Sequence, residues 1–205
     1  MRYRIDQCGI VVLAAGKSSR LGSPKQLLEF GGTKLVVRAV ETACFSKLYP
    51  VVVVLGAHAD KIKGYVSIPG VSVVENKEWE EGMASSIRCG LTEMDRLYPH
   101  VDGIIIMVCD QPLLHHEQIL RLIDLQDETG MPVSAASYRG VLGTPALFHK
   151  SVFSELMKLS GDTGARKILN QMQDEVAALP FDEGSIDIDT EEDYQNLLHL
   201  KTEEK

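Results

Sequence analysis

The sequence has no long hydrophobic run and no excess of positive charge. The apolar run that follows the polar N-terminus is interrupted at Gly16 and Lys17. That run is too short for a membrane span, and its flanks do not fit a secretory signal. The formal net charge of −8 argues against a nucleic-acid-binding protein, which would carry a basic surface. We therefore expect a cytoplasmic protein that binds neither a membrane nor nucleic acid.

Cysteines and linker-like segments are also scarce. The 4 cysteines are widely spaced and form no C-x-x-C pair, which favours reduced core residues over a disulfide or zinc framework. No repeat, low-complexity segment or linker rich in Pro, Gly or Ser divides the 205 residues. With 44% apolar and 24% charged residues, the chain has the composition of a globular protein with a sizeable core. We predict a single domain over 1–205, with a frayed, charged tail at 201–205.

Short apolar runs and helical patterns alternate along the chain. Three runs without alternation are typical of strands buried on both faces of a parallel sheet: Gly9–Leu13, Val51–Leu55 and Gly103–Val108. Weaker strands are predicted at Val71–Glu75, Val133–Tyr138, Thr144–Phe148, Glu175–Pro180 and Ile186–Ile188. Helical spacing predicts helices at Lys34–Ser46, Ala59–Val66, Gly82–Leu97, His115–Glu128, Lys150–Leu159 and Gly164–Met172. Thr190 and Asp193 come close to a capping box, which predicts a last helix ending at Leu200. The alternation indicates one α/β domain.

The segment VVLAAGKSSRLGSPK, from Val11 to Lys25, joins an apolar strand to a turn of small and cationic residues. It is not a P-loop, because that pattern needs a glycine where Val11 stands; Ser18 likewise replaces the second glycine of G-x-G-x-x-G. Small side chains let the backbone approach phosphate oxygens, and Arg20 and Lys25 supply positive charge. Local cations suffice for this in an acidic protein, so we predict a nucleoside triphosphate site. The alternative is an ordinary βα turn with solvated cations.

Five motifs follow one another along the chain. They are LAAGKSSRLGSPKQLL, Asn76-x-x-Trp79-x-x-Gly82-Met83-Ala84-Ser85-Ser86, Asp110-Gln111-Pro112, Gly161 to Arg166, and Asp187 to Asp193. The series resembles the nucleotidyltransferases that act on molybdopterin, within the wider NTP-transferase (pyrophosphorylase-type) superfamily. The best match is to the molybdenum cofactor cytidylyltransferase branch, which includes accessory proteins of xanthine dehydrogenase. The resemblance implies a single NTP-transferase domain with a Rossmann-like, three-layer α/β/α fold and a mostly parallel sheet of about seven strands, the nucleotidyltransferase fold.

The reaction implied by the resemblance joins CTP to the phosphate of Mo-molybdopterin and releases pyrophosphate. It would serve the maturation of a molybdenum hydroxylase such as xanthine dehydrogenase, an enzyme of purine catabolism, with transient contact between the two proteins. A phosphate monoester is already anionic near neutral pH, so the site needs in-line positioning and charge compensation rather than a strong base. The alternatives are a GTP-dependent enzyme, a sugar-phosphate nucleotidyltransferase, or a non-catalytic cofactor carrier. The sequence Ala14-Ala15-Gly16 matches the cytidylyl branch, since the guanylyl branch tends to carry an extra glycine there.

A divalent cation, Mg²⁺ with Mn²⁺ as the alternative, is the implied cofactor. Asp110 follows directly on a buried strand, and ligands of open α/β sheets bind outside the carboxyl ends of strands. Mg²⁺ prefers one or two carboxylates with phosphate oxygens and water, which Asp110 and Asp189 would supply. Asp187 is an alternative to Asp189, because alternate residues of an extended segment point the same way. Otherwise Asp110 is a turn acid and Asp189 a helix N-terminal acid.

The resemblance also assigns the remaining site residues. Lys25, Arg20 and Asp110 would be catalytic, the cations acting on the leaving pyrophosphate. Nucleotide-binding residues would be Leu13, Ala14, Ala15, Gly16, Lys17, Ser18, Arg20, Lys25, Gly82, Ser85, Ser86 and Asp110. Free amides at a helix N-terminus suit Gly82–Ser86 for that role, although Ser85 and Ser86 are alternatively helix caps.

The acceptor side is assigned to the motif from Gly161 to Arg166. Gly161, Asp162 and Arg166 would face the pterin, with Arg166 as an anion clamp; the alternative is a glycine turn between two helices. The family often has an arginine where this chain has Leu142. Arg139 is the candidate to replace that arginine.

Overall fold

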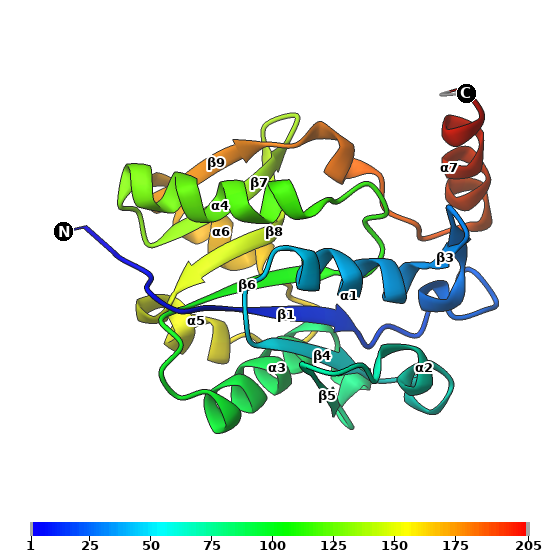
Figure 1. Ribbon diagram of the computed structural model, residues 1–205, viewed down its shortest axis with the longest axis horizontal. Helices are drawn as coiled ribbons and strands as arrows, with labels where there is room; N and C mark the ends of the chain where they lie inside the picture. The colour runs from blue at the N-terminus through cyan, green and yellow to red at the C-terminus, as the bar shows by residue number, and fades with distance from the viewer. Residues whose placement is uncertain (1, 204–205) are drawn as a thin grey trace.

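The strand β1 (Cys8–Ala14) lies in the middle of the computed structural model, which describes residues 2–203 (Figure 1). It pairs in parallel with β4 (Val51–Leu55) and β6 (Gly103–Val108). All residues of β1 and β4 are buried, and so is all of β6 except Val108, which is half-buried. Because both faces are covered, these strands carry the continuous apolar runs seen in the sequence.

Seven strands form the central sheet, in the order β5-β4-β1-β6-β8-β7-β9. The outer strands are β5 (Val71–Glu75), β7 (Val133–Tyr138), β8 (Val141–His149) and β9 (Val176–Pro180). Arg139 and Gly140 connect β7 and β8 with positive φ angles of 49° and 85°. So short a connection requires antiparallel strands, and β8 is antiparallel to both β6 and β7. The sheet is therefore mostly parallel, as predicted.

Helices cover both faces of this sheet. One layer holds α1 (Leu35–Phe45), α2 (Ala59–Val66) and α4 (His116–Thr129), and the other α3 (Met83–Leu97), α5 (Phe153–Met157) and α6 (Arg166–Gln171). Alternate side chains of β1 serve the two cores, with Ile10 in the core that includes Val36 of α1 and Val11 in the core that includes Ile87 of α3. The fold is the predicted three-layer α/β/α domain.

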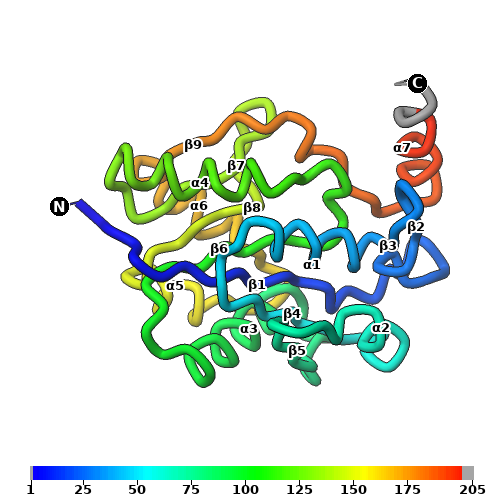
Figure 2. Tube along the Cα trace, viewed as in Figure 1, coloured from blue at the N-terminus to red at the C-terminus, as the bar shows by residue number. Residues whose placement is uncertain are grey.

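The last helix, α7 (Glu191–Glu203), lies away from the sheet beside a small hairpin of β2 (Glu29–Phe30) and β3 (Thr33–Lys34) (Figures 1 and 2). Leu197 and Ile188 are buried in one apolar cluster with Phe30 and Leu35. This packing places the C-terminal part of the chain next to the segment that follows β1. Among the described residues, no helix has the length and apolar character needed to cross a bilayer.

Some predicted boundaries are wrong. Ile186–Ile188 forms no strand, because Ile188 packs into the α7 cluster instead of pairing with a sheet edge. The predicted helix Lys150–Leu159 is a 3₁₀ turn followed by the short α5, and β8 begins at Val141 rather than Thr144. The hairpin β2–β3 was not predicted. Helix α7 continues past Leu200 through 201–203, and the rest of the predicted tail, 204–205, lies outside the described residues.

Candidate functional site

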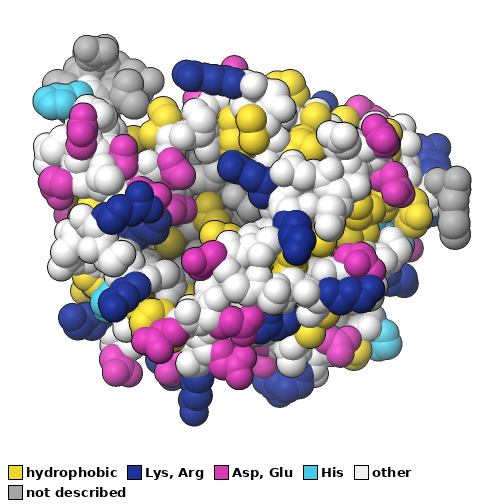
Figure 3. All heavy atoms as spheres, turned by 180° about the vertical axis from the view of Figure 1, so that it is seen from behind, with side chains coloured by type: hydrophobic (Ala, Val, Ile, Leu, Met, Phe, Trp, Pro, Cys, Tyr) yellow, Lys and Arg dark blue, Asp and Glu magenta, His cyan; other side chains and the backbone are white. Residues whose placement is uncertain are grey.

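The site forms where β1 and β6 end side by side. Leu13 is paired with Val108, and the amide of Cys109 donates to the carbonyl of Leu13 at 3.2 Å. The loop after β1 and Asp110 after β6 therefore leave the sheet at the same edge, where open α/β sheets bind ligands. A cavity of about 340 Å³ opens there, lined by Leu13 to Lys17, Lys25, Gly82, Ser86 and Asp110 among others. Figure 3 shows the molecule from behind, and this face is hollowed near its centre between basic and acidic side chains.

The carbonyl groups of the loop are held by donors from its surroundings. Gln26 Nε2 donates to the carbonyls of Ala14 (3.1 Å) and Gly16 (2.8 Å). The amide of Ala57 donates to the carbonyl of Ala15, at 3.1 Å. Among the described residues, no backbone amide of 16–20 has an internal acceptor. A run of unpaired amides beside small side chains is an anion-binding arrangement.

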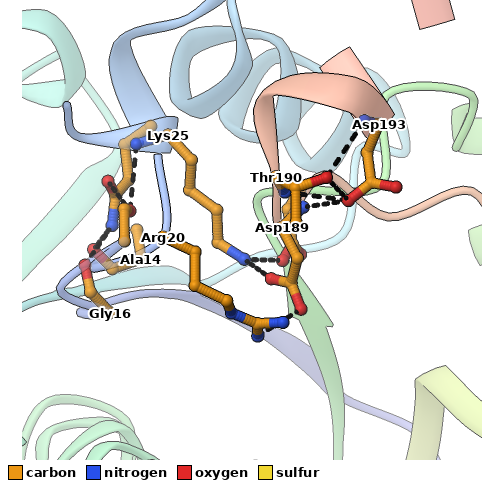
Figure 4. A network of polar contacts seen from close by, with 10 residues as sticks. Ala14, Gly16, Arg20, Lys25, Asp189, Thr190 and Asp193 are labelled. Carbon is orange, nitrogen blue, oxygen red and sulfur yellow. Dashed lines mark hydrogen bonds and ion pairs between the residues drawn. The ribbon is translucent and has the colours of Figure 1, made fainter. Parts of the chain in front are cut away.

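Four charged side chains from distant parts of the chain meet beside this loop, and Figure 4 labels three of them, Arg20, Lys25 and Asp189. Lys25 Nζ contacts Asp110 Oδ2 at 2.5 Å and Asp189 Oδ1 at 2.8 Å, and Arg20 Nη2 contacts Asp189 Oδ2 at 2.8 Å. The side chains of Lys25 and Asp110 are each only 16% exposed. The structure thus brings together the predicted catalytic residues and both predicted metal ligands.

These contacts set the protonation of the cluster. Burial acts to lower the pKa of Lys25, but the carboxylates of Asp110 and Asp189 outweigh it and raise that pKa well above its usual range. The hydrogen bond from Lys25 lowers the pKa of Asp189. Burial, followed by the charge of Asp110, raises the pKa of Asp187. At neutral pH the cluster therefore holds the ammonium of Lys25 against the carboxylate of Asp189.

The two serines of the Gly82–Ser86 motif have different surroundings. Ser86 lines the 340 Å³ cavity, although it is 5% exposed and also accepts a hydrogen bond from Asn76 Nδ2, at 3.0 Å. Ser85 is buried, donates to the carbonyl of Gly82 at 2.8 Å and accepts a hydrogen bond from Asn76 Nδ2 at 2.8 Å. Ser85 is thus occupied in holding the start of α3, and Ser86 is the serine that faces the cavity.

A second cavity, of about 560 Å³, adjoins the first. Its lining includes Arg139, Arg166 and Asp187, and it shares Met83, Val108 and Asp110 with the first cavity. Asp110 therefore stands at the junction of the two.

The motif from Gly161 to Arg166 is divided between the cavities. Asp162 lines the first cavity, whereas Arg166 lines the second. The carbonyl of Gly161 accepts from the amide of Ala84 at 3.1 Å. The backbone of Asp162 lies so close to Gly82 that a Cβ there would meet it at 2.6 Å. This contact seats the motif on the start of α3, between the two cavities.

A family model described as a MobA-like NTP transferase domain matches residues 10–176. The chain belongs to this family. It is 30% identical over 195 residues to purine catabolism protein PucB of Bacillus subtilis (strain 168), covering 90% of this chain and 92% of PucB. It is 32% identical over 200 residues to nicotine blue oxidoreductase of Paenarthrobacter nicotinovorans, covering 92% and 95% of the two chains.

A solved structure extends the likeness to three dimensions. Rv0371C of Mycobacterium tuberculosis H37Rv, crystallised in complex with manganese, is 30% identical with a TM-score of 0.75, covering 94% of this chain and 98% of that chain. Together with the family match, this places the protein among the MobA-like nucleotidyltransferases. It is a transferase with the fold predicted from its sequence.

The carboxylates of the MobA-like site fit a divalent cation. Oxygens of Asp110 and Asp189 converge on one point, which the ammonium of Lys25 fills. Within residues 2–203 no group of three His, Cys, Asp or Glu side chains forms a ready-made metal site. Mg²⁺ suits such an incomplete set, because it takes one or two carboxylates and completes its shell with phosphate oxygens and water.

Gln26 is a site residue to which the sequence analysis assigned no role. It is 1% exposed, and its amide bridges the carbonyls of Ala14 and Gly16. Its position next to Lys25 in the loop motif was the only available signal, since polarity usually indicates an exposed residue. Gln26 fixes the shape of the loop from behind.

Replacing Gln26 with leucine should weaken nucleotide binding roughly tenfold and lower the melting temperature. The substitution removes the donor of the buried Ala14 carbonyl, which costs about 1–3 kcal/mol, and also releases the carbonyl of the exposed Gly16. Nucleotide titration and thermal denaturation measure the two effects. The exposed Gln173 provides the control, Gln173→Leu, which should change neither. Unaltered nucleotide affinity in a folded Gln26→Leu protein would contradict the assigned role.

The capping box of α7 holds Asp189 in place. Asp193 Oδ2 accepts from the amide of Thr190 at 2.8 Å and its hydroxyl at 2.7 Å, and the amide of Asp193 donates to the Thr190 hydroxyl at 3.2 Å. The amide of Asp189 donates to the same carboxylate oxygen at 3.2 Å. The predicted cap is therefore confirmed, and it also tethers a residue of the charged cluster.

Replacing Asp193 with alanine should lower the free energy of unfolding by about 1 kcal/mol at neutral pH, the usual size of a lost cap. Hydrogen bonds from Thr190 lower the pKa of Asp193 in the folded protein. Its stabilisation is therefore present above the ordinary carboxyl pKa and is lost as the pH falls through the lowered value. Urea denaturation at several pH values should show the difference from wild type disappearing in acid. Glu192→Ala, in the same turn, should show no such pH dependence.

Proposed function

We propose that the protein transfers CMP from CTP to the terminal phosphate of Mo-molybdopterin and releases pyrophosphate. The observation that carries the proposal is the position of Asp110 at the junction of two cavities. One cavity is lined by the phosphate-binding loop and Lys25, and the other by Arg139 and Arg166. A nucleotidyl transfer needs this arrangement, because the donor and acceptor phosphates must meet in line at one point.

The donor site would use the chain's own charges. The unpaired amides of 16–20 would bind phosphate oxygens, and Lys25 and Arg20 would stabilise the negative charge that develops on the leaving pyrophosphate. Asp110 and Asp189 would hold Mg²⁺ or Mn²⁺, which would neutralise further charge on the triphosphate. The manganese complex of the related Rv0371C supports a divalent cation in this fold. Ser86 and Gly82 would form the wall next to the nucleoside.

The acceptor site would be the 560 Å³ cavity. Its volume lies in the range of small-molecule sites, about 300–1,000 Å³. Arg166 and Arg139 supply cations for an acceptor that carries a phosphate. Leu142 stands where the family often has an arginine, and the structure places Arg139 in the cavity lining instead. Arg139 is therefore the substitute we assign to that role.

The name of PucB supports a place in purine catabolism. We propose that the product matures a cytoplasmic molybdenum hydroxylase such as xanthine dehydrogenase, through transient contact.

The proposal is tested with nucleotide that carries a radiolabel on its α-phosphate. Transfer moves the label to the acceptor and releases unlabelled pyrophosphate. With Mo-molybdopterin and Mg²⁺, we expect labelled dinucleotide to form from CTP. Formation from GTP instead would change the base assignment, and transfer to a sugar phosphate would change the acceptor. No release with any nucleoside triphosphate would favour a cofactor carrier, or a redox function of the kind named in nicotine blue oxidoreductase.

A binding measurement gives an independent check. In the presence of Mg²⁺, CTP should raise the melting temperature more than GTP, ATP or UTP. A ligand that binds only the folded state at 100 times its dissociation constant adds about 2.7 kcal/mol of stability. A shift with GTP alone would overturn the cytidylyl assignment.

A further inference from the structure

The ammonium group of Lys25 occupies the point at which the two candidate metal ligands converge. Its Nζ lies 2.5 Å from Asp110 Oδ2. It lies 2.8 Å from Asp189 Oδ1 (Figure 4). The second oxygen of Asp189 is taken by Arg20 at 2.8 Å. The four side chains thus form a cluster of two negative and two positive charges that is already neutral.

A divalent cation entering this cluster alone meets two obstacles. It must separate Lys25 from both carboxylates, and the side chain of Lys25 is only 16% exposed, so solvent compensates the displaced ammonium poorly. It also adds two positive charges next to Lys25 and Arg20, which then lack anionic partners. Metal binding is therefore opposed as long as the two cations have nowhere else to go.

A nucleoside triphosphate removes both obstacles. Its phosphate groups bring several negative charges into the cavity that Lys25 lines together with residues 13–17. Lys25 and Arg20 then exchange carboxylate partners for phosphate oxygens, and the carboxylates become free for the metal.

We propose that Lys25 closes the cation site until a nucleotide binds, so that the divalent cation and the nucleoside triphosphate bind with strong positive coupling. The inference rests on the proposed function for the location of the two ligands. It adds that Lys25 determines when the metal enters. Because coupling between two ligands is reciprocal, the metal must raise nucleotide affinity by the same factor.

The proposal predicts that one substitution at the site strengthens metal binding instead of weakening it. Lys25→Met keeps the length of the side chain and removes its charge, which leaves Asp110 and Asp189 facing one another without the ammonium. Mn²⁺ in the absence of nucleotide should therefore bind this variant more tightly than wild type, by about 10-fold, within the roughly 5–150-fold range of typical coupling. The coupling to CTP should shrink correspondingly.

Mn²⁺ titration followed by electron paramagnetic resonance tests this without reference to turnover. Wild type and Lys25→Met are each titrated with Mn²⁺ alone and with CTP present, and Lys61→Met, at an exposed position of α2, is the matched control. Because CTP chelates Mn²⁺ by itself, the diagnostic quantity is the gain in Mn²⁺ affinity that CTP causes, compared between the proteins. We expect this gain to be at least fivefold larger in wild type than in Lys25→Met, within the range of typical coupling. Lys61→Met should behave as wild type.

Two results would overturn the inference. One is a folded Lys25→Met protein that binds Mn²⁺ alone no more tightly than wild type. The other is a gain in Mn²⁺ affinity on adding CTP that is the same in wild type and in Lys25→Met. If CTP binds and is transferred in either case, the proposed function stands and only the role of Lys25 fails. If no nucleotide binds, the proposed function fails, and the titration of the variant with Mn²⁺ alone still decides the role of Lys25.

Discussion

Replacing Asp110 with alanine is expected to lower turnover by about 10²–10³, the usual loss when one electrostatic group is removed from a reacting centre. Asp110 lies at the junction of the two cavities and contacts Lys25 at 2.5 Å. Its loss removes a candidate metal ligand and frees the ammonium that it holds. Steady-state release of pyrophosphate from CTP measures the effect. Most of the loss should appear in kcat, because the carboxylate acts on the metal-triphosphate rather than on the base.

The Asp110→Ala variant needs two accompanying measurements. Asp95→Ala, at an exposed position of α3, is the control and should keep wild-type turnover. Thermal denaturation shows whether Asp110→Ala is folded. Turnover within a factor of a few of wild type, in a folded Asp110→Ala protein, would rule out a metal-binding role for Asp110.

The second large effect is expected for Lys25→Met, with a loss of turnover of roughly 10²–10³. The methionine retains the apolar stem of the side chain but provides no charge for the leaving pyrophosphate. Nucleotide affinity should fall as well, whereas Mn²⁺ affinity without nucleotide should rise. A single-turnover measurement at saturating CTP separates the chemical step from the weaker binding.

The control for this loss is Lys61→Met, which should turn over like wild type. A further check is to repeat the comparison at high salt. The difference in turnover between wild type and Lys25→Met should persist, because salt screens a largely buried cation less than an exposed one such as Arg20. Retention of turnover in Lys25→Met, with CTP saturating, would show that Lys25 has no part in the chemistry.

Much of the fold follows from local patterns. The runs at β1, β4 and β6 could be read because strands buried on both faces need continuous apolar sequence. The pattern failed where a segment is stabilised by a distant partner. Ile186–Ile188 has an apolar sequence suited to a strand, yet Ile188 is buried against the α7 cluster. The start of β8 at Val141 was missed, because its pairing with β7 on both sides of Gly143 overrides local preference.

The candidate site, like the fold, could be predicted from the sequence only in part. Arg20, Lys25, Asp110 and Asp189 were predicted individually from their motifs, and the structure shows them in contact. Gln26 gained a role only when its burial behind the loop was seen. The motif of Gly161 to Arg166 read as one acceptor-side unit, whereas Asp162 and Arg166 line different cavities. A motif indicates which residues belong together, but the direction of each side chain depends on the turn that holds it.

The sequence by itself determined the α/β class, the buried central strands and the loop that we propose binds phosphate, because each depends on residues close together in the chain. Only the tertiary structure decided that Lys25 lies between Asp110 and Asp189, which are 85 and 164 positions away from it. Parallel pairing of β1 with β6 and the packing of α7 on the β2–β3 hairpin create that meeting. Hydrophobic periodicity reports which face of an element is buried, and it contains no information about which distant side chains will share that space.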